Sequence, residues 1–228
     1  MLLNKLRREI VLACHHAGEG HIPSALSILD ILYVLHRDVM RPQDRFVLSK
    51  GHGCLALYAV LAQSEDWSID DFCQYDSVFG GHPDCNKVHG VEASTGSLGH
   101  GLPMAVGMAL AAKIRKTDER IYCLIGDGEC NEGSIWEAAM LAAHHKLDNM
   151  CCIVDYNHST DRALKLGNVA RKFHAFDWIT IKVNGHYHAG LVMALNYPPC
   201  HAPFAIICET VKGYGVKRME NNPAWHHR

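Results

Sequence analysis

The spacing of hydrophobic positions changes halfway along the chain. In the first half, apolar residues recur at helical spacing in three segments, which begin at Leu6, Leu26 and Leu55. A glycine-rich loop over 96–101 then leads into a fourth helix over 103–113, rich in small residues. In the second half, short apolar runs rich in β-branched residues predict strands, and helical stretches separate them. The predicted strands are 121–125, 150–156, 179–183 and 204–208, and the predicted helices are 134–146, 169–176 and 188–195.

Strand, helix and strand in regular alternation predict right-handed βαβ units around a buried parallel sheet. We therefore expect an α/β fold, a parallel sheet flanked by helices, as a single domain over residues 1–228 with the helix-rich first half covering one face. Two helix starts are indicated by local signals. Ser24 is a candidate N-cap of the second helix, and Ser68 with Asp71 resembles a capping box for a short helix through Tyr75.

Composition excludes several classes of function. The 228 residues carry 22 basic and 24 acidic side chains, which leaves no basic field for nucleic acid. The first residues do not resemble a secretory signal, and no apolar stretch of the sequence is long enough to span a bilayer, so we expect no membrane contact. Its 10 cysteines form no C-x-x-C pair and are expected to be reduced core residues, with Cys130 the one worth attention. These features indicate a cytoplasmic protein.

Polar residues follow two of the predicted strands. Gly126, Asp127 and Gly128 end the first, and Asn157 ends the next, 30 residues after Asp127. The carboxyl ends of parallel strands are where open α/β sheets bind ligands. A carboxylate and an amide oxygen there suit Mg²⁺, and the N-terminus of the next helix, near Ser134, favours an anion. The pattern predicts a metal-bridged diphosphate, although Asp-Gly alone is also a common turn.

Around these residues the chain resembles a known family. The Gly-Asp-Gly motif followed by Asn157 is similar to the thiamin diphosphate signature, and its surroundings resemble the N-terminal, diphosphate-binding half of transketolases. The resemblance runs in collinear order over nearly the whole chain. The matching stretches are GHIPS at 20–24, SILDIL at 27–32, LSKGHG at 48–53, GHP at 81–83, VEASTGSLGHG at 91–101, GDGECNEG at 126–133, KGYGV at 212–216 and MENNPAWHH at 219–227.

The resemblance implies a set of site residues. Asp127, the Asn157 side chain and the main-chain carbonyl of Ser159 would bind Mg²⁺. His52 and His226 would contact the diphosphate and substrate hydroxyls, and Glu132, with Glu137, would join an acidic network across an interface between subunits. The further cofactor-binding positions implied are Gly96, Leu98, Gly126 and Gly128.

Histidines are implied as the catalytic side chains. His21 and His82 match residues that line the channel above the thiazolium, and His226 joins them as the third. The implied reaction cleaves the C–C bond beside a ketose carbonyl, so hydroxyl protons must be removed and returned. Imidazole suits this task because it titrates near neutral pH.

The family's acid that protonates the cofactor's aminopyrimidine lies on a separate domain, which we do not expect within these 228 residues. The resemblance therefore implies one subunit of a split transketolase, active on sugar or sugar-phosphate substrates only with a pyrimidine-binding partner, in a heterotetramer. A shortened segment after Asn157 and the early chain end depart from the family. Two alternatives stay open: a decarboxylating enzyme that makes a deoxyketose, and a non-catalytic thiamin diphosphate-binding or assembly subunit.

Overall fold

A five-stranded parallel sheet forms the centre of the protein. The computed structural model describes residues 2–65, 67–162, 164–198 and 200–227. The strands run in the order β1-β2-β3-β5-β4, and every neighbouring pair is parallel. Their bounds are β1 Arg45–Leu48, β2 Ile121–Gly126, β3 Met150–Tyr156, β4 Ile179–Asn184 and β5 Phe204–Glu209. The expected parallel sheet is confirmed, and β1 is an edge strand that the sequence pattern did not reveal.

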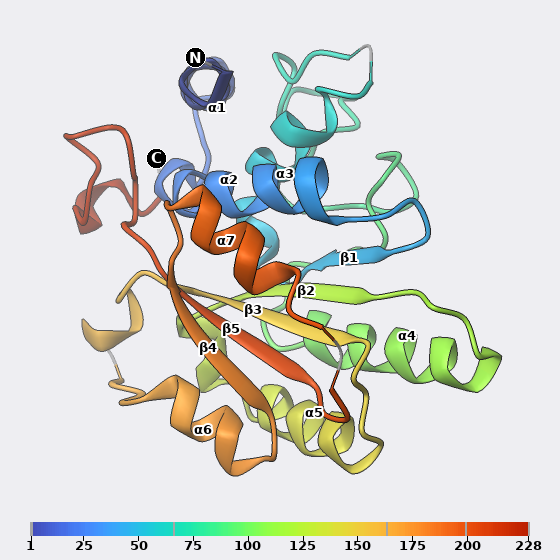
Figure 1. Cartoon of the computed structure of the whole chain (residues 1–228). Helices are drawn as coiled ribbons and strands as arrows, with labels where there is room; N and C mark the ends of the chain where they lie inside the picture. Colours follow the sequence, from blue (N-terminus) through green and yellow to red (C-terminus); the bar gives the residue numbers. More distant parts are fainter. Residues whose placement is uncertain (1, 66, 163, 199, 228) are drawn as a thin grey trace.

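Helices cover both faces of the sheet (Figure 1). One face carries α2 Ile22–Val34, α3 Cys54–Leu61 and α7 His188–Leu195, with α1 Leu2–Ala17 packed outside α2 and α3. The other face carries α4 Gly101–Arg115, α5 Gly133–His144 and α6 Val169–Ala175. The prediction that the first half covers one face is therefore wrong for α4. Right-handed crossovers explain the arrangement. The connections through α4, α5 and α6 all advance across the sheet in one direction, whereas the connection through α7 returns from β4 to β5.

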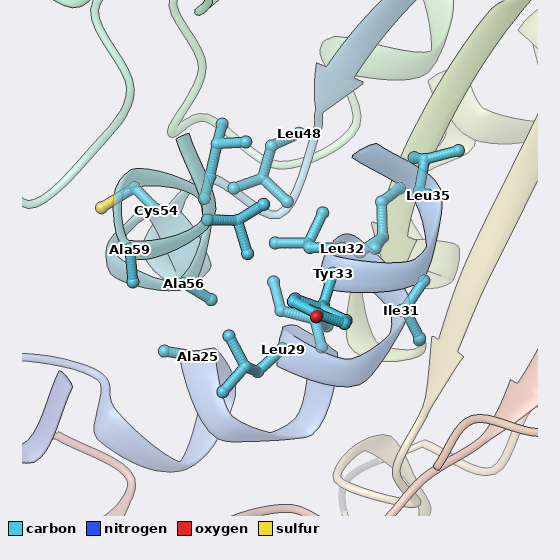
Figure 2. Close-up of a cluster of buried hydrophobic side chains, with 14 of the residues drawn as sticks. Ala25, Leu29, Ile31, Leu32, Tyr33, Leu35, Leu48, Cys54, Ala56 and Ala59 are labelled. Carbon is cyan, nitrogen blue, oxygen red and sulfur yellow. The ribbon is translucent and has the colours of Figure 1, made fainter. Parts of the chain in front are cut away.

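The core has two parts, one on each side of the sheet. All of α2, from Ile22 to Val34, is buried, as expected for a helix that is hydrophobic all round. Figure 2 shows Leu29 and Leu32 of this helix facing residues of α3 and Leu48 at the end of β1. Strand side chains alternate between the two parts of the core, so the central strands are apolar at nearly every position.

Two predicted helix starts are wrong. Ser24 is a buried residue inside α2, whose N-cap position is His21. Residues 68–75 form turns instead of a helix. There the Ser68 hydroxyl accepts a hydrogen bond from the backbone N–H of Asp70 at 3.2 Å, and Cys73 takes a left-handed φ of 54°. A side chain that bonds its own backbone in this way favours a turn over a helix.

The cysteines differ in exposure. Cys14, Cys54, Cys123, Cys130, Cys151, Cys152 and Cys208 are buried, as expected, but Cys85 is exposed and Cys73 and Cys200 are half-buried. All ten are free thiols. Burial raises the pKa of Cys130 well above its usual value, so this residue beside the Gly-Asp-Gly turn is an unreactive core thiol.

Within the described ranges, no helix is long and apolar enough to cross a bilayer.

Candidate active site

A cavity of about 310 Å³ opens at the carboxyl ends of the strands. Lys50 follows β1, Asp127 follows β2, Asn157 follows β3 and Lys212 follows β5, so the sheet topology brings distant parts of the chain together there. The lining residues are His21, Ser24, Lys50, His52, His82, Gly96, Leu98, Gly126, Asp127, Gly128, Glu129, Asn157, Ser159, Lys212 and His226. All predicted catalytic and metal-binding residues, and all predicted cofactor-binding residues except Glu132, line this one cavity.

Asp127 and Asn157 are held by short local contacts. One Asp127 oxygen accepts a hydrogen bond from the N–H of Gly128 at 2.8 Å, and the other accepts one from the N–H of Thr160 at 3.4 Å. The Asn157 side-chain oxygen accepts from the N–H of Ser159 at 3.1 Å. Burial, together with the charge of Asp155, raises the pKa of Asp127. A cation in the cavity would offset both effects.

A buried ion pair forms the floor of the cavity. Lys50 Nζ lies 2.5 Å from an oxygen of Asp155, and their side chains are 2% and 0% exposed. Ser27 and the Asn157 amide also donate to this carboxylate, at 2.8 and 2.9 Å, and Thr210 donates to its other oxygen. Burial alone would raise the pKa of Asp155, but Lys50 and the hydrogen bonds lower it. Because its NH₂ group bonds Asp155, Asn157 keeps its oxygen on the side of Ser159.

Four imidazoles line the cavity. The His21 ring centroid lies 5.1 Å from that of His52 and 5.4 Å from that of His226. Nδ1 of His21 donates to the backbone carbonyl of His226 at 3.1 Å. Burial lowers the pKa of His21 to about 4, and burial with the charge of Lys50 lowers the pKa of His52 to about 2. Burial, helped by Lys212, also lowers the pKa of His226.

These shifts favour the uncharged form of His21, His52 and His226 at neutral pH. The catalytic roles expected for His21, His82 and His226 stay predictions. A neutral imidazole donates from one nitrogen and accepts at the other, so it can hold a sugar hydroxyl in either sense. An anion bound beside these rings would raise their pKa values again.

Glycines give the cavity its shape at two positions. Gly96 has a φ of +155°, and a Cβ built there would lie 2.9 Å from a ring carbon of His82. Among the residues that the structure describes, a Cβ on Gly128 would meet no atom within 4 Å, so a ligand can approach this backbone closely. In the part of the chain that the structure describes, the buried Ser24 hydroxyl has no hydrogen-bond partner, although it lines the cavity. These features fit a polar ligand that closely approaches the backbone.

Some predictions and the structure differ at the edge of the site. Glu132 is exposed and lies outside the cavity, as does Glu137, so their roles across an interface stay predictions. Lys50, Lys212 and Glu129 line the cavity, although the sequence predicted no role for them. Lys50 and Lys212 lie within stretches that resemble the family. The feature of the sequence that could have identified both residues is a single lysine that follows an apolar strand and directly precedes a glycine.

Comparisons with known proteins agree with this geometry. Residues 1–227 match the sequence profile described as "Transketolase, thiamine diphosphate binding domain". An apulose-4-phosphate transketolase subunit of Phocaeicola vulgatus is 38% identical, over 98% of this chain and 86% of that protein. The "6-deoxy-6-sulfo-D-fructose transketolase subunit SqwG" of a Clostridium species is 36% identical, over 92% and 83%.

Longer proteins match as well. The mouse transketolase is 39% identical over 98% of this chain, which spans only 38% of that protein. The crystal structure of the Campylobacter jejuni transketolase superposes with a TM-score of 0.90 and 33% identity, over 99% of this chain and 39% of that one. The fold, the site at the strand ends and the match over residues 1–227 agree with one another. The chain therefore belongs to the transketolase family, of which it is a thiamine diphosphate-binding domain.

Proposed function

We propose that this chain is the diphosphate-binding subunit of a split transketolase. It would transfer a two-carbon ketol unit from a ketose, or ketose phosphate, to an aldose. The observation that carries the proposal is the placement of Asp127 and Asn157 at the ends of neighbouring parallel strands, facing a cavity lined by four imidazoles. Two relatives are named as transketolase subunits, and this chain covers more than four fifths of the length of each.

Thiamin diphosphate and Mg²⁺ fit the residues present. Asp127, the Asn157 side chain and the Ser159 carbonyl offer only oxygen ligands, which Mg²⁺ prefers. The raised pKa of Asp127 reflects a burial penalty that a cation would offset. The open backbone at Gly128, Lys212 and the Ser24 hydroxyl, which has no hydrogen-bond partner among the described residues, suit diphosphate oxygens. When bound, thiamin diphosphate supplies the carbanion that cleavage beside a ketose carbonyl requires.

The chain's own residues then bind and orient the sugar. We assign to His21, His82 and His226 the contacts with substrate hydroxyls and the transfer of their protons, and to His52 a diphosphate contact. Because burial keeps His21 neutral, its Nε2 is free of a proton when Nδ1 donates to the His226 carbonyl. This nitrogen can therefore accept a hydrogen bond from a substrate hydroxyl, the contact that a proton transfer requires.

The remaining acid would come from a second chain. We propose a pyrimidine-binding partner in a heterotetramer, because this chain spans only 38% of the mouse enzyme and its relatives of similar length are named as subunits. Glu132 and Glu137 are exposed and so accessible to such a partner. The ten free thiols favour a cytoplasmic location.

Calorimetry tests the cofactor site. Asp127→Ala should weaken Mg²⁺-dependent binding of thiamin diphosphate by about a hundredfold or more, since loss of groups that only support metal ligands already costs 10–100-fold. Asp71→Ala, at an exposed carboxylate outside the cavity, is the matched control and should bind as the unaltered chain does. Unchanged affinity in Asp127→Ala would show the metal assignment to be wrong.

Co-expression with the candidate partner tests the split enzyme. The pair should transfer ketol units from a panel of ketose donors, and the isolated chain should show no turnover. Turnover by the isolated chain would contradict the need for a partner. A pair that binds thiamin diphosphate but releases CO₂ from a 2-oxo acid would favour the decarboxylating alternative, and a pair without either activity would favour the non-catalytic one.

A further inference from the structure

A buried polar cluster lies beside the active site without lining it. Asp30, in the middle of α2, is 3% exposed. Its carboxylate oxygens lie 2.6 Å from the Arg7 guanidinium of α1, 3.1 Å from a ring nitrogen of His186 and 2.9 Å from one of His188. Three segments of the chain therefore meet at one carboxylate. Burial alone would raise the pKa of Asp30, but the hydrogen bonds from the histidines and the charge of Arg7 lower it. The carboxylate is therefore ionised at neutral pH.

The geometry fixes the proton on His186. Its Nε2 lies 2.9 Å from the backbone nitrogen of Val211, which can only donate, so Nε2 accepts. The other nitrogen, Nδ1, must then carry the proton, and it donates to the ionised Asp30. One neutral imidazole thus joins the carboxylate to the backbone of a distant strand end.

The same imidazole also stacks on that segment. The rings of His186 and Tyr214 lie 3.6 Å apart with an angle of 14° between their planes. The Arg7 guanidinium carbon lies 5.1 Å from the centre of the Tyr214 ring. Residues 211–214 are therefore held by a hydrogen bond at one end and by a ring stack at the other.

The residue after Val211 is Lys212, which lines the cavity. Its Nζ lies 3.0 Å from Ser159 Oγ and 2.9 Å from Nδ1 of His226. Displacement of the Val211 backbone would move Lys212 away from both groups. The cluster around Asp30 therefore contacts residues on both sides of Lys212, Val211 and Tyr214.

We propose that Asp30 and His186 are positioning residues that clamp segment 211–214 and thereby set the place of Lys212 in the active site. The effect on the cofactor rests on the proposed function, whereas the clamp itself rests only on the contacts above. Neither residue lines the cavity, so both act through Val211 and Tyr214.

Substitutions at His186 separate the parts of the clamp. His186→Phe keeps a ring to stack on Tyr214 but removes both hydrogen bonds. His186→Gln retains an acceptor that can reach the N–H of Val211. His174→Phe, at an exposed histidine of α6, is the matched control. Amide hydrogen exchange of the full chain is the first readout, because it needs neither cofactor nor activity.

We expect His186→Phe to speed exchange at Val211 about tenfold, the equilibrium equivalent of one lost hydrogen bond. The amides of β2 should exchange as before, and the Gln variant should lie within about threefold of the unaltered chain. Binding of thiamin diphosphate with Mg²⁺ should weaken about tenfold in the Phe variant and recover in the Gln variant. The control should change neither quantity.

Three results would overturn the clamp: exchange at Val211 unchanged by the Phe substitution, exchange accelerated equally in β2, or no recovery with Gln. Nitrogen NMR of the unaltered chain gives an independent measurement if the Phe variant fails to fold. It should find His186 protonated on Nδ1 and not on Nε2, and the opposite tautomer would refute the proposal. If the unaltered chain binds no thiamin diphosphate, the proposed function fails, while the exchange data still decide the clamp.

Discussion

Removal of the buried lysine charge at the cavity floor should destabilise the fold severely. In Lys50→Met the side chain keeps its approximate length, but Asp155 loses its counter-charge. At 2.5 Å and an effective dielectric constant of about 20, the gross attraction is roughly 7 kcal/mol. The variant no longer desolvates an ammonium group, and Ser27, Thr210 and Asn157 still donate to the carboxylate. We therefore expect a net loss of about 3–5 kcal/mol in the free energy of unfolding.

Urea denaturation followed by circular dichroism measures this loss. The matched control is Lys5→Met, which removes an exposed partner of Glu9, 3.5 Å away and one helical turn along α1, and should cost less than about 0.5 kcal/mol. The double variant with Asp155→Asn should be more stable than the sum of the single losses implies, because it leaves no unpaired buried charge. A loss below about 1 kcal/mol for Lys50→Met would refute the reasoning.

Two further predictions concern packing and pH. Gly101→Ala should lower the free energy of unfolding by about 3 kcal/mol, since its Cβ would lie 2.6 Å from the Ser49 Cα. Gly107→Ala, at an open position in the same helix, should raise it by about 0.5–1 kcal/mol. Thermal unfolding of the two variants checks these opposite signs. Burial lowers the pKa of His36 to about 4 from an ordinary 6.5. Between these two pH values the unfolded chain binds more protons than the folded chain, so the free energy of unfolding decreases as the pH is lowered. His36→Asn should lose about 2 kcal/mol less between pH 7 and pH 5 than the unaltered chain, and equal losses in urea titrations at the two pH values would contradict this.

Much of the fold could be predicted from the pattern of apolar residues. The strand over 150–156 and the helix over 188–195 have the predicted bounds, because each is a long apolar run with clear ends. Strand β1 is only four residues long and runs into the LSKGHG stretch, so its apolar pattern was too short to identify. The expected helix at Ser68 rested on a local capping signal, which a competing turn overrides.

The site was predictable where strand ends determine it. The proximity of Asp127 and Asn157 could be predicted from the parallel sheet, since the carboxyl ends of its strands lie at one edge. Lys50 and Lys212 gained their roles only through tertiary contacts, with Asp155 at a separation of 105 residues and with Ser159 at 53. No periodicity along the chain encodes such contacts. The pKa values of the histidines likewise depend on burial that the sequence does not specify.

The cavity joins the two ends of the chain, and this affects how the site forms during folding. His21 and His226 touch across 205 residues, and the strands between them pair only in parallel, through long crossovers. Closing such large loops costs conformational entropy, which slows the formation of long-range contacts. The site should therefore be completed late in folding, after the central strands have paired. Ligand binding would then report a fully folded chain. Ligand at a hundred times its dissociation constant would stabilise the whole chain, both termini included, by about 2.7 kcal/mol.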